Sequence, residues 1–176
     1  NPDGASGDPA SAINWRYLVF RSDASNLVAG DNNSESDVFL KDQISGSVSR
    51  LSVSSSGIEG NGDSRKPAVS PIGPDGFVAA AFESDSTNLS SFSNSQGVRQ
   101  IYIRLPLLNY TEVVSLGSGP VVGDEDSFVP SLTLIPAPNR VLAVFSSDAS
   151  NLVSGDTNNR RDIYLATITF PKVITV

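Results

Sequence analysis

The chain has no cysteine, no histidine and no methionine among its 176 residues, and only one tryptophan. Without cysteine there can be no disulfide, no thiol nucleophile and no Cys-ligated metal. Without histidine a Ser-His-Asp arrangement is excluded, and both the commonest general base and the usual zinc ligand are missing. Because the initiator methionine is also missing, we expect that a segment once preceded Asn1.

Positive charge and long apolar runs are also scarce. The chain has 12 Lys and Arg against 19 Asp and Glu, a net charge of −7. Nucleic-acid binding needs a basic face, so we expect no nucleic-acid partner. No window approaches the roughly 18 consecutive apolar residues of a membrane helix, so we expect no membrane insertion. The abundance of Ser, Asn, Gly and Thr predicts an extracytoplasmic protein, periplasmic or secreted.

One eight-residue string recurs three times, and each copy begins with Phe and ends with Leu. The copies start 82 − 20 = 62 and 145 − 82 = 63 residues apart. Phe, Ser, Asp, Asn and Leu hold the same places in every copy. The copies are Phe20-Arg-Ser-Asp-Ala-Ser-Asn-Leu27, Phe82-Glu-Ser-Asp-Ser-Thr-Asn-Leu89 and Phe145-Ser-Ser-Asp-Ala-Ser-Asn-Leu152. Such a period indicates a repeat architecture.

Four short apolar runs accompany each copy in the same order. They are rich in Val, Ile, Phe and Tyr and are bounded by Gly, Pro, Asn, Asp and Ser, which is the pattern of β-strands. The runs fall at 9–13, 17–19, 38–40 and 50–53, at 67–69, 78–81, 101–103 and 113–116, and at 130–132, 141–144, 163–165 and 173–176. No segment has the apolar spacing of a long helix. The sequence therefore predicts an all-β, β-propeller-like fold of three four-stranded antiparallel blades.

We expect a single propeller-like domain over residues 1–176, with blades at about 1–59, 60–122 and 123–176. Three blades cannot close a ring, since propellers have about four to eight. The open ends would expose apolar faces, which do not stay bare in solution. We favour a homodimer in which two chains complete a six-bladed ring. The alternative is that the chain is an excised part of a longer propeller.

Two segments resemble a known repeat. Ser22 to Asn33 is followed by Asp37-Val38-Phe39, and Ser147 to Asn158 is followed by Asp162-Ile163-Tyr164. With the linker Gly60-Asn-Gly-Asp-Ser-Arg-Lys-Pro67, this pattern resembles bacterial TolB-like, WD-like β-propeller repeats. The resemblance implies a propeller and a binding platform. The middle unit departs from the pattern at 90–94 and at Gln100, which stands in place of the Asp.

The repeated Asp and Asn residues that follow the second strand of each unit form the first candidate site. They could present a ring of polar ligands, but residues repeated in every blade usually serve the blade. We therefore interpret them as structural Asx-turn residues whose side chains bond nearby backbone N–H groups. They are Asp23, Asn26, Asp85, Asn88, Asp148 and Asn151.

Oxygen side chains at alternating positions form the second candidate site. Ca²⁺ takes six to eight oxygen ligands, and one such loop can supply several of them. The third unit places Arg160 within the pattern, and the middle unit lacks its Asp residues. Turn residues are the favoured interpretation, with Ca²⁺ binding as the alternative and no other cofactor expected. The candidate ligands are Asp31, Asn33, Asp37, Asp156, Asn158 and Asp162.

The leading functional hypothesis is a non-enzymatic binding or interaction module with a protein or small-molecule ligand. The alternatives are a structural part of a multidomain propeller protein and a carboxylate-dependent, glycoside hydrolase-like enzyme. For the enzyme, Glu83 and Glu112 are the candidates for individual roles, because neither has a counterpart in the other units.

Overall fold

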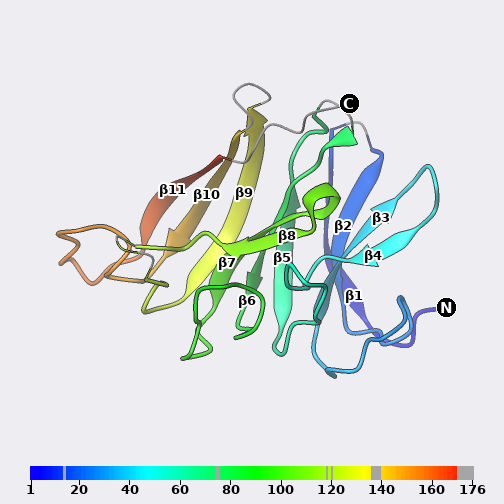
Figure 1. Ribbon diagram of the computed structural model, residues 1–176, viewed down its shortest axis with the longest axis horizontal. Coiled ribbons are helices and arrows are strands. Elements are labelled where there is room, and N and C mark those ends of the chain that lie inside the picture. The colour runs from blue at the N-terminus through cyan, green and yellow to red at the C-terminus, as the bar shows by residue number, and fades with distance from the viewer. Residues whose placement is uncertain (14, 74–75, 118, 120, 136–139, 170–176) are drawn as a thin grey trace.

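Three antiparallel sheets stand side by side in the computed structural model, in the order in which the chain makes them (Figure 1). The structure describes residues 1–13, 15–73, 76–117, 119, 121–135 and 140–169. Within these residues the first two sheets have four strands each and the third has three, and no α-helix is present. The predicted all-β class is confirmed.

Each sheet is a meander in which consecutive strands are hydrogen-bonded neighbours. The first contains β1 (Ser6–Ser11), β2 (Tyr17–Ser22), β3 (Asp37–Asp42) and β4 (Val48–Arg50). The second contains β5 (Ser64–Val69), β6 (Ala80–Ser84), β7 (Gln100–Leu105) and β8 (Tyr110–Val113), with the 3₁₀ turn η2 (Pro106–Leu108) before β8. The third contains β9 (Ser127–Ile135), β10 (Arg140–Ser147) and β11 (Asp162–Thr169). The run predicted at 173–176 lies outside the described residues.

The fourth strands begin and end earlier than the apolar runs that predicted them. The run 50–53 overlaps β4 only at Arg50, and the run 113–116 overlaps β8 only at Val113. One further ladder bond follows each strand: the Leu51 N–H donates to the Val38 carbonyl over 2.7 Å, and the Val114 N–H donates to the Ile101 carbonyl over 2.8 Å. The later apolar residues therefore leave the ladder and cover the core.

Two hydrophobic cores fill the spaces between the sheets. Each core joins one face rich in branched aliphatic side chains to one face rich in aromatic side chains. The first core packs Val19, Val38 and Leu40 of the first sheet against Phe82, Leu89 and Tyr102 of the second sheet and its β6–β7 loop. The second packs Ala81, Ile101 and Ile103 against Phe145, Leu152 and Tyr164. The two faces of the middle sheet differ because side chains alternate along a strand.

The first strand of every sheet contains a shift in register at a residue that precedes proline. Asp8, Lys66 and Val129 have φ angles of 51, 49 and 50°, in the left-handed region. Residues other than glycine seldom adopt this region, and a β-branched residue such as Val129 does so least often. The backbone N–H of Lys66 donates to Asp8 over 3.3 Å, and that of Val129 donates to Glu83 over 2.7 Å. A carboxylate of the preceding sheet therefore holds each of these two bulges in place.

Serine pairs join the first two strands of every sheet, and the pairs of the second and third sheets are buried. The hydroxyls of Ser6 and Ser22 lie 2.8 Å apart. The equivalent pairs are Ser64 with Ser84, at 3.0 Å, and Ser127 with Ser147, at 2.9 Å. The structure repeats where the sequence does, down to these side-chain hydrogen bonds. No helix long and apolar enough to cross a membrane occurs in the described part of the chain.

Candidate functional site

The polar loop of the first repeat brings its three candidate residues to the start of β3. Asp37 is fully buried there, and the Ser52 hydroxyl donates to it over 2.5 Å. The side-chain amide of Asn33 donates to Asp37 over 3.3 Å and to the Gly60 carbonyl over 2.9 Å. Burial raises the pKa of Asp37, while Ser52 and Arg50 act in the opposite direction.

An arginine stands among the carboxylates of this loop. Asp31, Asp37 and Glu59 place oxygens within 4.8 Å of one another, and among the described residues they form the only acidic group tight enough to share a cation. The guanidinium of Arg50 lies 3.1 Å from Asp37 and 4.0 Å from Asp31, and it also pairs with Glu59. Arg50 therefore supplies the positive charge that a metal ion would bring.

Sequence reasoning missed Arg50 and Glu59, although a signal for them exists. Both stand where the second repeat has valine, at Val113 and Val122. Two coordinated departures from a repeat, one to a cation and one to an anion, indicate an ion pair in place of an apolar contact.

The middle repeat makes the same connection without charge. Gln100 occupies the position of Asp37, and the Ser115 hydroxyl donates to its carbonyl oxygen over 2.5 Å. The side-chain amide of Gln100 donates to the Gly123 carbonyl over 2.8 Å. The shared task of this position is therefore to tie the start of the third strand to the segment that follows the sheet.

The loop of the third repeat is more open. The side-chain amide of Asn158 donates to Asp162 over 2.9 Å, as Asn33 does to Asp37. The Tyr164 hydroxyl donates to Asp156 over 2.9 Å, and burial, with Asp156 acting in the same direction, raises the pKa of Tyr164 to about 12. These residues line an open depression beside β11. The repeat position of Arg50 is here Val173, outside the described residues.

The three repeated asparagines connect their turns to the linker that precedes each sheet. Asn88 accepts from the Asn61 N–H over 3.1 Å and donates to the Glu59 carbonyl over 2.8 Å. The same two bonds are made by Asn26 with Asp3 and Asn1, and by Asn151 with Asp124 and Val122. Their partners lie 23–29 residues away. These side chains therefore make long-range hydrogen bonds between turn and linker, and not the local Asx-turns that we expected.

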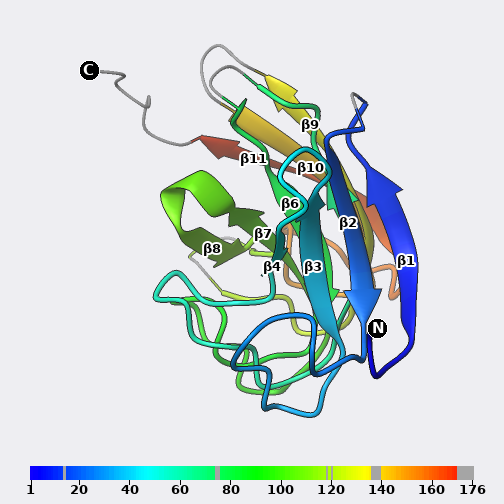
Figure 2. The same ribbon diagram turned by 90° about the vertical axis from the view of Figure 1, so that its right-hand side faces the viewer.

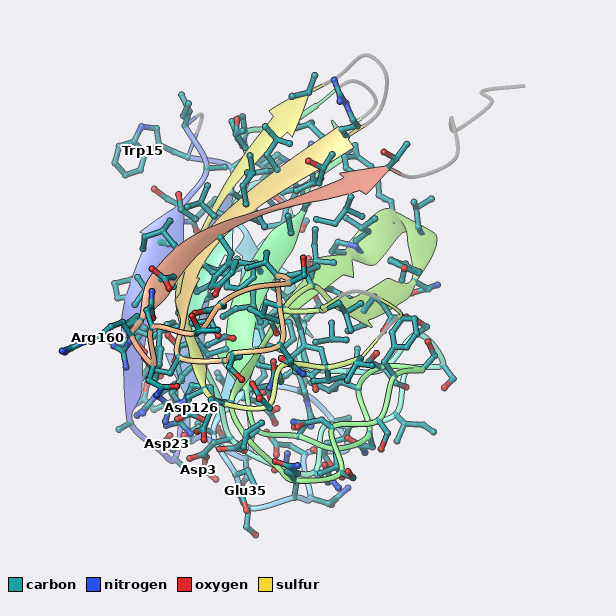
Figure 3. The ribbon with its side chains drawn as sticks, turned by 90° about the vertical axis from the view of Figure 1, so that its left-hand side faces the viewer. Asp3, Trp15, Asp23, Glu35, Asp126 and Arg160 are labelled. Atoms are coloured by element: carbon teal, nitrogen blue, oxygen red, sulfur yellow. The ribbon has the colours of Figure 1, made fainter. Side chains whose placement is uncertain are left out.

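The three repeated aspartates form ion pairs with arginines. Asp23 pairs with Arg21 over 3.1 Å, Asp85 with Arg65 over 3.2 Å and Asp148 with Arg161 over 2.7 Å. The Arg161 guanidinium lowers the pKa of Asp148, whereas burial raises that of Asp85. The acidic residues labelled in Figure 3 gather at the lower end of the molecule, where the linkers and turns meet.

The two glutamates weighed as catalytic acids have separate partners. Glu83 on β6 is buried, accepts from the Val129 N–H and lies 3.6 Å from the Arg99 guanidinium. Glu112 on β8 accepts hydrogen bonds from the hydroxyls of Ser90 and Ser91. Strand β7 lies between β6 and β8. The geometry therefore assigns each glutamate a structural contact of its own.

The outer face of the third sheet is apolar and open. Val144, Ile163 and Leu165 expose 42, 72 and 63% of their surface, and we call them the free aliphatic face. Their counterparts in the second sheet are fully buried: Ala81, Ile101 and Ile103. Strand β11 lies at the front of Figure 3, which looks onto this end of the molecule. The face therefore has the composition of a core and the exposure of a surface.

The opposite end of the molecule carries the other kind of face. Leu18, Phe20 and Leu27 are half-buried, and we call them the free aromatic face. Their counterparts at the first core are buried: Ala80, Phe82 and Leu89. Figure 2 looks onto this first sheet.

No protein-family model matches the chain, and no curated protein matches it either.

Proposed function

We propose that this protein is a non-enzymatic interaction module, built as an open run of β-propeller blades, which works by packing its free aliphatic face against another protein surface. One observation carries the proposal: positions that are buried in the second sheet are exposed in the third. Contiguous apolar surface of this kind marks protein–protein contact sites.

The arrangement of the sheets supports the propeller as the form of this module. The sheets are consecutive meanders, and the first strands β1, β5 and β9 contact one another in series while the later strands diverge (Figure 1). Radial repetition of four-stranded sheets about an inner strand is the propeller plan. The TolB-like resemblance and an extracytoplasmic location belong to the same proposal.

Photo-crosslinking in the cells that make the protein tests the proposed function. A photoreactive phenylalanine analogue replaces Leu165 in one variant and Arg160, an exposed loop residue, in a matched control. We expect a discrete adduct from position 165 and none from position 160. Equal yields at the two positions would contradict the proposal. Peptide mapping of the adduct identifies the partner, which is a separate question.

A further inference from the structure

The two internal interfaces follow one rule for what an aliphatic face accepts. In both cores the aliphatic face of one sheet receives the Phe, Tyr and Leu face of the next sheet along the chain. Within the described residues, the third sheet has an exposed aliphatic face and the first sheet has a half-buried aromatic face. The two free faces are therefore the complementary halves of one more interface of the same kind.

One backbone hydrogen bond between neighbouring sheets is repeated beside each internal interface. The Ser64 N–H donates to the Ser36 carbonyl over 2.7 Å, and the Ser127 N–H donates to the Arg99 carbonyl over 2.8 Å. The same positions at the free ends are Ser6, which offers an N–H, and Arg161, which offers a carbonyl. The Ser6 N–H and the Arg161 carbonyl can therefore pair in the same head-to-tail arrangement that brings the two apolar faces together.

Two side-chain hydrogen bonds distinguish the internal interfaces from the free ends. Asp63 accepts from the Ser36 N–H over 2.9 Å, and Asp126 accepts from the Arg99 N–H over 2.8 Å. The first repeat has Ala5 at this place. The two carboxylates that accept from the backbone N–H of Lys66 and of Val129 are Asp8 and Glu83. Their counterparts on the third sheet are Val129 and Ser146, which have no carboxylate. An interface between the free ends therefore lacks both kinds of side-chain hydrogen bond, and we expect it to separate before the sheets themselves unfold.

We propose that a second copy of this chain covers the free aliphatic face with its own free aromatic face. This inference rests on the interaction function proposed above and names its partner. The contact is head-to-tail, and such contacts make a closed ring when the rotation closes. Each copy has three sheets, so two copies give six blades, within the range of known propellers. The Ser6 N–H of one copy donates to the Arg161 carbonyl of the other.

Solution mass by light scattering tests the inference, with one variant for each face. Wild type is expected at twice 18.5 kDa, about 37 kDa. Leu165→Asp and Phe20→Asp each remove one face, and each is expected at 18.5 kDa. An equimolar mixture of the two variants is expected to recover the 37 kDa species at high concentration, because one of the two contacts in the mixed dimer joins two unaltered faces and the other carries both substitutions. Leu27→Asp replaces Phe20→Asp if circular dichroism shows that the latter is unfolded.

Each other outcome overturns the inference. A wild type that stays at 18.5 kDa up to millimolar concentration has no self-contact. A dimer that survives Phe20→Asp but not Leu165→Asp joins two aliphatic faces, and a ladder of larger masses means that the ring does not close. A monomer whose photo-adduct at position 165 is a different protein would refute the second copy and leave the interaction function standing.

Discussion

At the scale of single residues, the most informative positions are those that break the repeat. Arg50 and Glu59 replace Val113 and Val122 of the second repeat and turn an apolar contact into a buried charge cluster. Such clusters are costly to break by removing one partner, because the remaining charges stay buried without compensation. Arg50 is therefore a structural cation.

Arg50→Met tests this role. We expect a loss of about 3–5 kcal/mol in the free energy of unfolding, because Asp31, Asp37 and Glu59 lose their cation. Urea denaturation at pH 7 measures the loss. In wild type, EDTA and millimolar Ca²⁺ should leave the melting temperature unchanged. A rise with Ca²⁺ that Asp31→Asn abolishes would contradict this account, because it would place a metal among the carboxylates that Arg50 pairs with.

Glu83 gives the stability a pH dependence that can be isolated. Burial raises its pKa above the ordinary value of 4.5, against the opposing effects of the Val129 N–H and Arg99. The folded state then holds the proton more tightly than the unfolded chain, so the free energy of unfolding falls as pH rises from about 4.5 through the raised pKa.

Glu83→Gln keeps an acceptor for the Val129 N–H and removes the titration. We expect the stability of this variant relative to wild type to increase between pH 4.5 and neutrality. Parallel urea titrations at several pH values measure the difference, in which the contributions of Asp37 and the other acids cancel. A constant difference across this range would show that Glu83 does not titrate as described.

At the scale of elements, strands were predictable because their signal is local. The run Ile101-Tyr-Ile103 forms half of β7, since β-branched and aromatic residues mark strands wherever they pack. The partners of Asn88 were not predictable, because Asn61 and Glu59 lie 27 and 29 residues away. Exposed apolar faces at the open ends were predicted, but the residues of the free aliphatic face were not, since Ile163 reads in sequence like Ile101 and differs only in what covers it.

The same substitution at the equivalent positions Ile101 and Ile163 measures how much their difference in burial contributes to stability. Ile101→Asn buries an amide without partners, and we expect it to cost more than about 3 kcal/mol. Ile163→Asn lies on the exposed face, and in protein diluted to the monomer it should cost less than about 1 kcal/mol. Thermal unfolding of both variants under the same conditions checks the contrast. Equal losses would mean that the third sheet is already covered within the chain.

At the scale of the whole molecule, the chain is a series of sheets with one core between each pair and complementary faces at its ends (Figure 1). Its stability and its association therefore use the same kind of contact. We expect the interface between copies to be the weakest in the series, since Ala5 stands where Asp63 and Asp126 strengthen the internal ones.

The reactivity of a thiol on the free aliphatic face tests the central claim most directly. Because the chain has no cysteine, Leu165→Cys places a single thiol there, and Arg160→Cys provides an exposed control. We predict that the thiol at position 165 is protected at high protein concentration and becomes reactive on dilution, whereas the control reacts at one rate throughout. A thiol at position 165 that reacts as fast as the control at every concentration would contradict the account.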